Sequence, residues 1–188
     1  FQYALVRTAK GMLILADSLR ETALTRYGLH EGAEVIAHTT GQALMMAFQA
    51  AGPHAQDRGL EAVAYAWREM KHVPDTALWE KPQGKNPPLK MEKRFTIVPR
   101  GVALVIACST FPTWNGYPGI FASLVTGNPV IVKAHPTVIL PLAISVAVAR
   151  AVLSEAGFDP NLVSLLIDDP AAPVAKDVAM NPEVRLID

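Results

Sequence analysis

Residues 99–136 read PRGVALVIACSTFPTWNGYPGIFASLVTGNPVIVKAHP and contain two apolar runs separated by a helical stretch. The first run, 102–107, stops just before Ser109, and the second, 130–132, ends on Lys133. Short apolar runs bounded by turn residues are typical of buried strands in a parallel sheet. Polar residues that follow such strands lie at the carboxyl edge of the sheet, where open α/β folds bind their ligands. We therefore expect the functional site at this edge.

The part of the chain after residue 136 continues the alternation of helix and strand. It predicts a helix over 136–156, a strand over 162–167, a helix over 170–180 and a strand over 184–187. Alternation of this kind is typical of parallel βαβ units with right-handed crossovers and helices on both faces. The predicted fold class is α/β, with a doubly wound, Rossmann-like parallel sheet.

The part of the chain before residue 99 is mainly helical and then extended. Apolar residues at spacings of three and four predict helices over 1–27 and 60–72, with a second helix from about residue 31 into the forties between them. Poor helix formers at 38–42 interrupt this second helix, and 43–51 is predicted to be helical again. A proline-rich change of composition then predicts an extended connector, with its best strand candidate at 93–98. This connector either lies across a neighbouring surface or is a plain surface linker. The predicted organisation is a helical part that packs on the sheet, a connector and a nucleotide-binding α/β part, over residues 1–73, 74–98 and 99–188.

Composition excludes several classes of function. The chain has 188 residues and a formal net charge of zero, so charge favours neither nucleic acid nor an anionic membrane as a partner. Its apolar runs are shorter than the roughly 18 to 20 residues of a membrane-spanning helix. A single cysteine, Cys108, excludes an internal disulfide and favours a reducing, cytoplasmic setting. The five histidines lack metal-ligand spacing, so no metal site is expected.

The central stretch resembles the cofactor domain of the aldehyde dehydrogenase superfamily. The resemblance rests on a Pro-x-Gly at 99–101, on the Cys-Ser-Thr-Phe-Pro string at 108–112, and on Gly127-Asn128 ahead of Val132-Lys133. The strings HTTGQALMMAFQAAGPHAQDRGLEAVAYAW, from residue 38, and CSTFPTWNGYPG, from residue 108, are similar to the phenylacetic acid degradation branch of that superfamily. The resemblance covers essentially the whole chain.

The resemblance implies that the intact protein uses NADP or NAD to oxidise an aldehyde or semialdehyde, CoA-linked or not, to an acid. It implies a role in aromatic catabolism, a homo-oligomeric state, and a reaction through a thiohemiacetal and a thioacyl-enzyme. The nucleophilic cysteine and general-base glutamate of the family are expected beyond Asp188, so the chain is expected to be a cofactor-domain fragment, inactive alone. Two alternatives stay open: a non-catalytic nucleotide-binding or assembly module, and a thiol enzyme built on Cys108.

The resemblance also implies individual site residues. Those expected to contact the cofactor are Ile106, Ala107, Cys108, Ser109, Lys133, His135 and Pro136. Lys133 matches the lysine that reaches the adenosine ribose, although it is otherwise an ordinary solvated lysine at a strand end. Pro136 stands where NAD-preferring members carry a glutamate, so we expect NADP to be accepted or preferred, with His135 as a donor to its 2′-phosphate. The alternative is that His135 is simply a residue at the entry to the next helix and has no role in cofactor binding.

Three departures from the family pattern qualify this site. Thr110 replaces the asparagine that donates to the oxyanion, so it is the candidate catalytic residue, with a structural strand-end role as the alternative. Cys108 takes the place of a motif proline and is interpreted as a small buried side chain rather than the nucleophile. Asp168 and Asp169 replace a glycine-containing turn, and two carboxylates there disfavour an anion unless they point to solvent.

Overall fold

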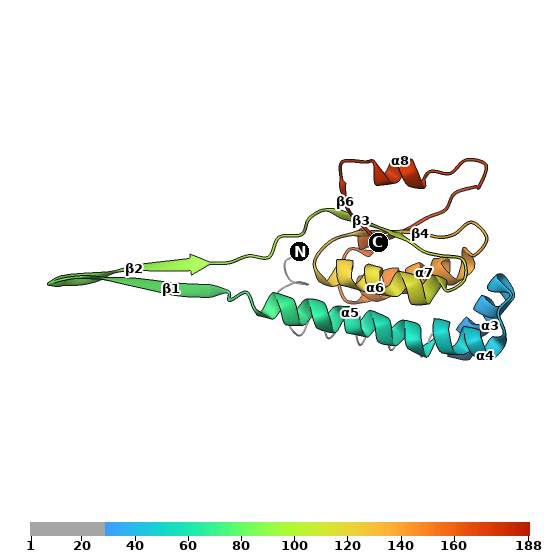
Figure 1. Cartoon of the computed structure of the whole chain (residues 1–188), viewed down its shortest axis with the longest axis horizontal. Coiled ribbons are helices and arrows are strands. Elements are labelled where there is room, and N and C mark those ends of the chain that lie inside the picture. Colours follow the sequence, from blue (N-terminus) through green and yellow to red (C-terminus); the bar gives the residue numbers. More distant parts are fainter. Residues whose placement is uncertain (1–28) are drawn as a thin grey trace.

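The computed structural model describes residues 29–188, with side chains from residue 34 onward. The helix predicted over 1–27 lies outside these residues. The described chain forms a parallel sheet covered by helices, and a long hairpin projects from this body (Figure 1). The sheet, which carries the predicted site, is the centre of the fold.

The sheet has four parallel strands in the order β5-β4-β3-β6. Their bounds are Val102–Ile106 for β3, Val130–Lys133 for β4, Val163–Leu166 for β5 and Val184–Ile187 for β6. The α/β class is confirmed, and β6 has the predicted bounds. The central strands β3 and β4 are the most buried because each has a neighbouring strand at both edges and α6 packs on one face.

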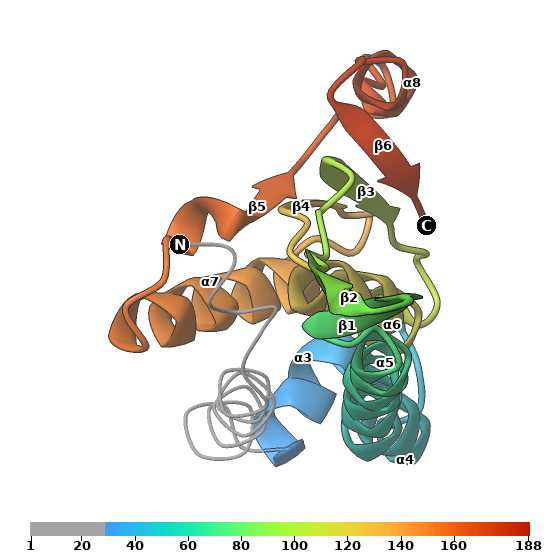
Figure 2. The ribbon, with the colours of Figure 1, turned by 90° about the vertical axis from the view of Figure 1, so that its left-hand side faces the viewer.

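Helices α6 (Pro112–Val125) and α7 (Leu140–Glu155) cover one face of the sheet. The short helix α8 (Ala175–Ala179) lies on the other side (Figures 1 and 2). The 3₁₀ turn η2 (Pro160–Leu162) leads from α7 into β5. The main core fills the space between the sheet and the first two helices; it includes Ala103, Val105, Leu124, Val132, Leu142 and Leu153.

Two of these helices are shorter than the sequence predicts. Helix α7 starts at Leu140 rather than at 136, because the preceding residues form a turn in which Val138 N–H donates to the His135 carbonyl over 2.9 Å. Helix α8 spans five residues instead of 170–180. The residues ahead of it form turns capped by the carboxylates of Asp168 and Asp169.

A helical layer packs against α6, as predicted. Its elements are α3 (Leu29–Thr40), α4 (Leu44–Met46), the π-helical turn η1 (Ala47–Ala51) and α5 (Pro53–Lys71). Helix α5 begins earlier than the predicted residue 60, because proline is well tolerated in the first helical turn. Val63 of α5 packs on Val125 of α6. Buried Gly59 lets the two helices approach so closely that a Cβ there would meet the Phe121 ring.

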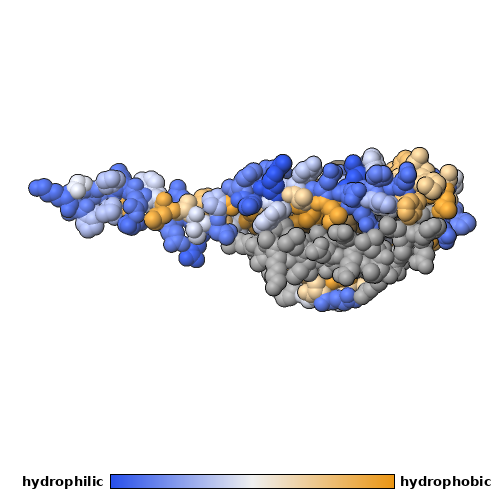
Figure 3. Space-filling view, turned by 90° about the horizontal axis from the view of Figure 1, so that it is seen from below, coloured by the Kyte–Doolittle hydropathy of each residue, from blue (hydrophilic) through white to orange (hydrophobic). Residues whose placement is uncertain are grey.

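The segment predicted as a connector is an antiparallel hairpin. Strand β1 (Thr76–Gln83) pairs with β2 (Asn86–Arg94) through a turn that contains Gly84, whose φ is +63°. The strand predicted at 93–98 is wrong beyond Arg94, where pairing with β1 ends. Nearly every hairpin residue is exposed, and the arm is mostly hydrophilic with isolated apolar patches on the face shown in Figure 3.

Candidate functional site

The carboxyl edge of the sheet brings the ends of β3 and β4 together. Ile106, the last residue of β3, is 42% exposed, and its N–H donates to the Asp188 carbonyl over 2.8 Å. Ala107 is buried, and its N–H donates to the Lys133 carbonyl over 3.0 Å. From β3 the chain winds to β4 and β5 on one side and then returns to β6 on the other. The strand order therefore reverses beside β3, at the position where doubly wound folds bind ligands.

The loop after β3 is held by its own side chains. The N–H of Cys108 donates to Asn115 Oδ1 of α6 over 2.9 Å, and the Phe111 N–H donates to Cys108 Sγ over 3.4 Å. The Cys108 thiol lies 3.6 Å from the Thr110 hydroxyl. Neither of these partners is a general base, which favours a structural thiol over a nucleophile. Ser109 is half-buried in the same loop.

Thr110 lies exposed at the tip of this loop. Its carbonyl accepts a hydrogen bond from Gln42 Nε2, which reaches across from the turn after α3. Gln42 therefore connects the helical layer to the loop that carries the candidate oxyanion residue. This contact could not be predicted from the sequence, because a glutamine in a turn between helices is an ordinary surface residue.

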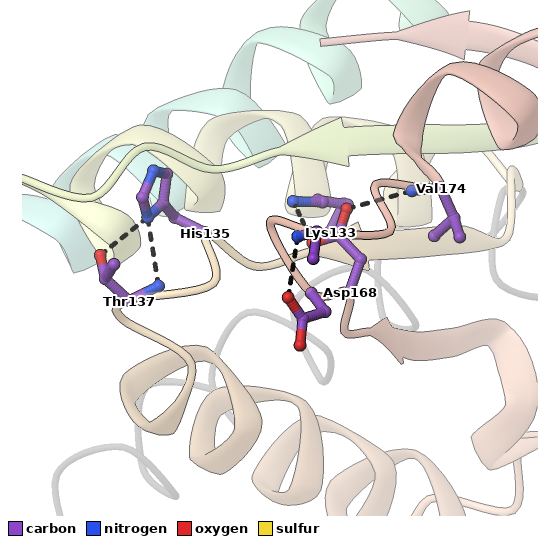
Figure 4. Close-up of polar contacts among 7 residues, drawn as sticks. Lys133, His135, Thr137, Asp168 and Val174 are labelled. Carbon is purple, nitrogen blue, oxygen red and sulfur yellow. Dashed lines mark hydrogen bonds and ion pairs between the residues drawn. The ribbon is translucent and has the colours of Figure 1, made fainter.

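Lys133 ends β4 with an ion pair rather than as a solvated side chain. Its Nζ lies 2.7 Å from Asp168 Oδ1, and the two side chains are only 9% and 2% exposed (Figure 4). The other carboxylate oxygen of Asp168 accepts the Val174 N–H over 3.3 Å. Hydrogen bonding from Lys133, helped by the Val174 N–H, holds the pKa of the Asp168 carboxyl below its usual value in spite of burial.

The predicted partners His135 and Pro136 belong to a turn of their own. His135 Nδ1 lies 2.8 Å from the Thr137 hydroxyl and accepts the Thr137 N–H over 3.3 Å (Figure 4). Pro136 is half-buried between them. His135 thus lies in the turn that precedes α7, and both its helix-entry role and a contact with a phosphate stay predictions.

Asp168 is a site residue whose role the sequence did not reveal. The sequence indicated two carboxylates after β5 but gave no partner for either. The missing information was strand order: β4 and β5 are neighbours with Lys133 opposite Leu166, so residues just past the end of β5 meet the end of β4. Asp169 is the exposed one of the two, and its Oδ1 accepts the Ala171 N–H over 2.8 Å.

Two other properties concern the described residues alone. Within residues 29–188, no group of three histidine, cysteine, aspartate or glutamate side chains is placed to hold a metal ion. None of the helices in that range combines the length and the apolar character needed to cross a bilayer.

Two solved structures that are similar to this chain are those of dehydrogenases. An NAD-dependent aldehyde dehydrogenase from Burkholderia multivorans is 58% identical, with a TM-score of 0.85 over 99% of this chain. A glyceraldehyde-3-phosphate dehydrogenase from Methanocaldococcus jannaschii, solved with NADP, is 15% identical and shares the fold, with a TM-score of 0.68 over 99% of this chain. The chain spans 34% of the first protein and 38% of the second.

A local similarity and a family match complete the comparison. An isoleucine–tRNA ligase from Thiobacillus denitrificans is 70% identical over 44 residues, which are 23% of this chain and 5% of the ligase. This match covers too little of the ligase to indicate that the present chain has ligase activity. The aldehyde dehydrogenase family, in contrast, matches residues 26–188, which contain the whole sheet and every predicted site residue. The chain belongs to the aldehyde dehydrogenase family.

Proposed function

We propose that this chain supplies much of the cofactor site of an NAD(P)-dependent aldehyde dehydrogenase. The observation that carries the proposal is Lys133, fixed at the carboxyl end of β4 beside the switch in strand order. The 58% identical protein from Burkholderia multivorans is described as NAD-dependent, which supports the same cofactor class here.

The residues at this edge fit a dinucleotide. Apolar side chains suit the faces of planar rings, and Ile106 and Ile167 are 42% and 52% exposed at the ends of β3 and β5. Ribose hydroxyls need hydrogen-bond partners, which the Lys133–Asp168 pair supplies. Apart from its ion pair, the buried Asp168 Oδ1 accepts no hydrogen bond from the described residues, so it has acceptor capacity for a hydroxyl that reaches it. When bound, the nicotinamide of the cofactor accepts a hydride from the substrate.

Thr110 is the residue of this chain proposed to face the reacting aldehyde. Its loop is fixed by Gln42 and Asn115, so its hydroxyl has a defined position at the sheet edge. A hydroxyl donates one hydrogen bond, which suits a developing oxyanion less well than the two donors of an amide. We propose the phenylacetate-degradation branch, and hence an aromatic-catabolism semialdehyde, CoA-linked or free, on the two sequence strings that resemble it.

We also propose that the domain boundaries lie at 73 and 98 and that the protein is a homo-oligomer. The projecting hairpin supports the homo-oligomer. An isolated two-stranded hairpin is only marginally stable in water, so a projecting hairpin is stabilised when it packs against another protein surface. Its register places Trp79 opposite Met91 and Lys81 opposite Leu89 on one face. That face is apolar with a basic rim, whereas the other face carries the ion pair between Glu80 and Lys90.

The direct test is calorimetric titration of the protein, expressed from its complete reading frame, with NAD and with NADP. We expect binding of at least one dinucleotide and a loss of affinity on the order of tenfold or more in Lys133→Ala. Lys176→Ala removes an exposed lysine from α8 and is the matched control, expected to bind like wild type.

Turnover separates the proposed enzyme from the non-catalytic alternative. Aldehyde-dependent reduction of the dinucleotide is measured with aromatic aldehydes, free semialdehydes and CoA-linked semialdehydes. Reduction with any of them supports the dehydrogenase. Tight dinucleotide binding without reduction by this panel supports a nucleotide-binding module, and absence of binding rejects both.

A further inference from the structure

The Lys133–Asp168 pair has a consequence for which dinucleotide the site accepts. The lysine at the end of β4 is the cation that a 2′-phosphate on the adenosine ribose would pair with. In this chain its Nζ is already 2.7 Å from a carboxylate oxygen, and both side chains are almost fully buried. The lysine therefore presents little net charge to an incoming anion.

The carboxylate is fixed in place and cannot turn away at little cost. Asp168 Oδ1 pairs with Lys133, and Oδ2 accepts the Val174 N–H at the start of the α8 region. Moving the carboxylate would leave two buried polar groups without their partners, which is costly in a protein interior. The next residue, Asp169, is exposed, so water screens its charge and the buried Asp168 is the carboxylate that bears on the ribose.

The nearest other candidate cation does not restore the balance. His135 has its Nδ1 engaged by the Thr137 N–H and hydroxyl, in a turn separate from the ion pair (Figure 4). A 2′-phosphate would therefore bring about two negative charges towards a fixed carboxylate, and His135 offers it only the single hydrogen bond of its Nε2, which these contacts leave unoccupied. The two ribose hydroxyls of NAD, in contrast, are uncharged, so this carboxylate does not repel them.

We propose that Asp168 makes this cofactor site selective for NAD over NADP. This inference rests on the proposed function, because it assumes that the ribose lies beside Lys133. It reverses the expectation drawn from Pro136: the glutamate that is missing after β4 is replaced by a carboxylate that enters from the end of β5. Asp168 is thus a specificity-determining residue at a position where the sequence pattern predicted only an unfavourable charge.

The test compares calorimetric affinities for NAD and NADP in wild type and in two matched variants of the protein expressed from its complete reading frame. Wild type is expected to bind NAD more tightly than NADP. Asp168→Asn keeps the shape of the side chain and frees Lys133, so its affinity for NADP relative to NAD is expected to rise on the order of tenfold or more. Asp169→Asn makes the same change in net charge one residue later and is expected to keep the wild-type ratio.

Each outcome of this comparison decides one question. Tighter binding of NADP than of NAD by wild type overturns the inference without any variant, so a poorly folded Asp168→Asn protein does not leave it untested. An unchanged ratio in a folded Asp168→Asn variant, checked by circular dichroism, overturns it as well. Equal shifts in both variants assign the effect to overall charge rather than to Asp168. Failure of wild type to bind either dinucleotide overturns the proposed function itself.

Discussion

A single amide side chain, Asn128, joins the loop ahead of β3 to the loop ahead of β4. Its Oδ1 accepts the Arg100 N–H over 2.7 Å and the Gly101 N–H over 3.2 Å, while its Nδ2 donates to the Thr126 hydroxyl over 2.9 Å. Asn128 is 4% exposed, so these contacts satisfy an amide that has little access to water. The side chain thus aligns the two strands whose far ends form the site.

Asn128→Ala is expected to lower the free energy of unfolding by about 1 to 3 kcal/mol, because two backbone N–H groups lose their acceptor. Urea denaturation followed by circular dichroism measures the change. The control is Asn181→Ala, which removes an exposed side chain that accepts one N–H from Glu183. Equal effects of the two substitutions would contradict the special role of the buried amide.

Tyr117 is a half-buried residue between α6 and α7. Its hydroxyl lies 2.9 Å from Ser145 Oγ, and Ser145 in turn donates to the Pro141 carbonyl. Burial raises the pKa of Tyr117 above its usual value of 10.0, and the hydrogen bond with Ser145 offsets part of that rise. Above pH 10 the unfolded chain therefore releases this proton while the folded chain retains it.

Stability contributed by Tyr117 is accordingly complete below pH 10 and is lost as the pH rises from 10 towards the higher pKa of the folded state. The loss is up to about 1.4 kcal/mol per pH unit within that window. In Tyr117→Phe, stability measured between pH 8 and 11 is expected to fall less steeply than in wild type. Tyr65→Phe, at a position 55% exposed, is expected to retain the wild-type slope.

At the residue scale, the sequence indicated where the site lies but not its internal pairing. Ile106, Lys133 and Thr110 were placed at the sheet edge because strand ends can be read from apolar runs. The partners Gln42 and Asp168 could not be identified, because each contact joins segments that only the packed fold brings together. The spacing of apolar residues predicts helices and strands, but it does not predict which polar side chains from distant segments will meet.

At the element scale, buried strands were predictable and the exposed hairpin was not. Strands β3, β4 and β6 are short apolar runs, and their predicted bounds agree with the structure to within a residue or so. Strands β1 and β2 contain Pro82, Pro87 and Pro88, residues that normally argue against a strand. Prolines are tolerated there because a two-stranded hairpin has only edge positions.

The contact between α5 and α6 depends on Gly59. Gly59→Leu is expected to destabilise the protein by about 1 to 3 kcal/mol, because the added side chain would collide with the Phe121 ring. Thermal unfolding measures the change. Asp57→Leu places the same side chain at an exposed position of the same helix and is expected to stay within about 0.5 kcal/mol of wild type. A neutral Gly59→Leu would show that the two helices separate easily.

At the scale of the whole molecule, the hairpin is the part that projects from the body (Figure 1). If its apolar face mediates the proposed homo-oligomer, a Trp79→Ser, Met91→Ser double variant is expected to sediment as a smaller species than wild type. Analytical ultracentrifugation of the protein from its complete reading frame makes this measurement. The control is Glu80→Ser, Lys90→Ser on the opposite face, expected to leave the sedimentation unchanged. An unaltered double variant would assign assembly to another surface.

The strand order also means that β3 is synthesised well before its neighbour β6. Strand β3 pairs with β6 on one side, yet 77 residues separate Ile106 from Val184 (183 − 106). At ribosomal rates of roughly 5 to 20 residues per second, that edge of β3 waits about 4 to 15 s for its neighbour. An open apolar strand edge is a template for wrong pairing during that interval. Nascent chains that stall between these strands are therefore the form of this protein with the greatest need of a chaperone.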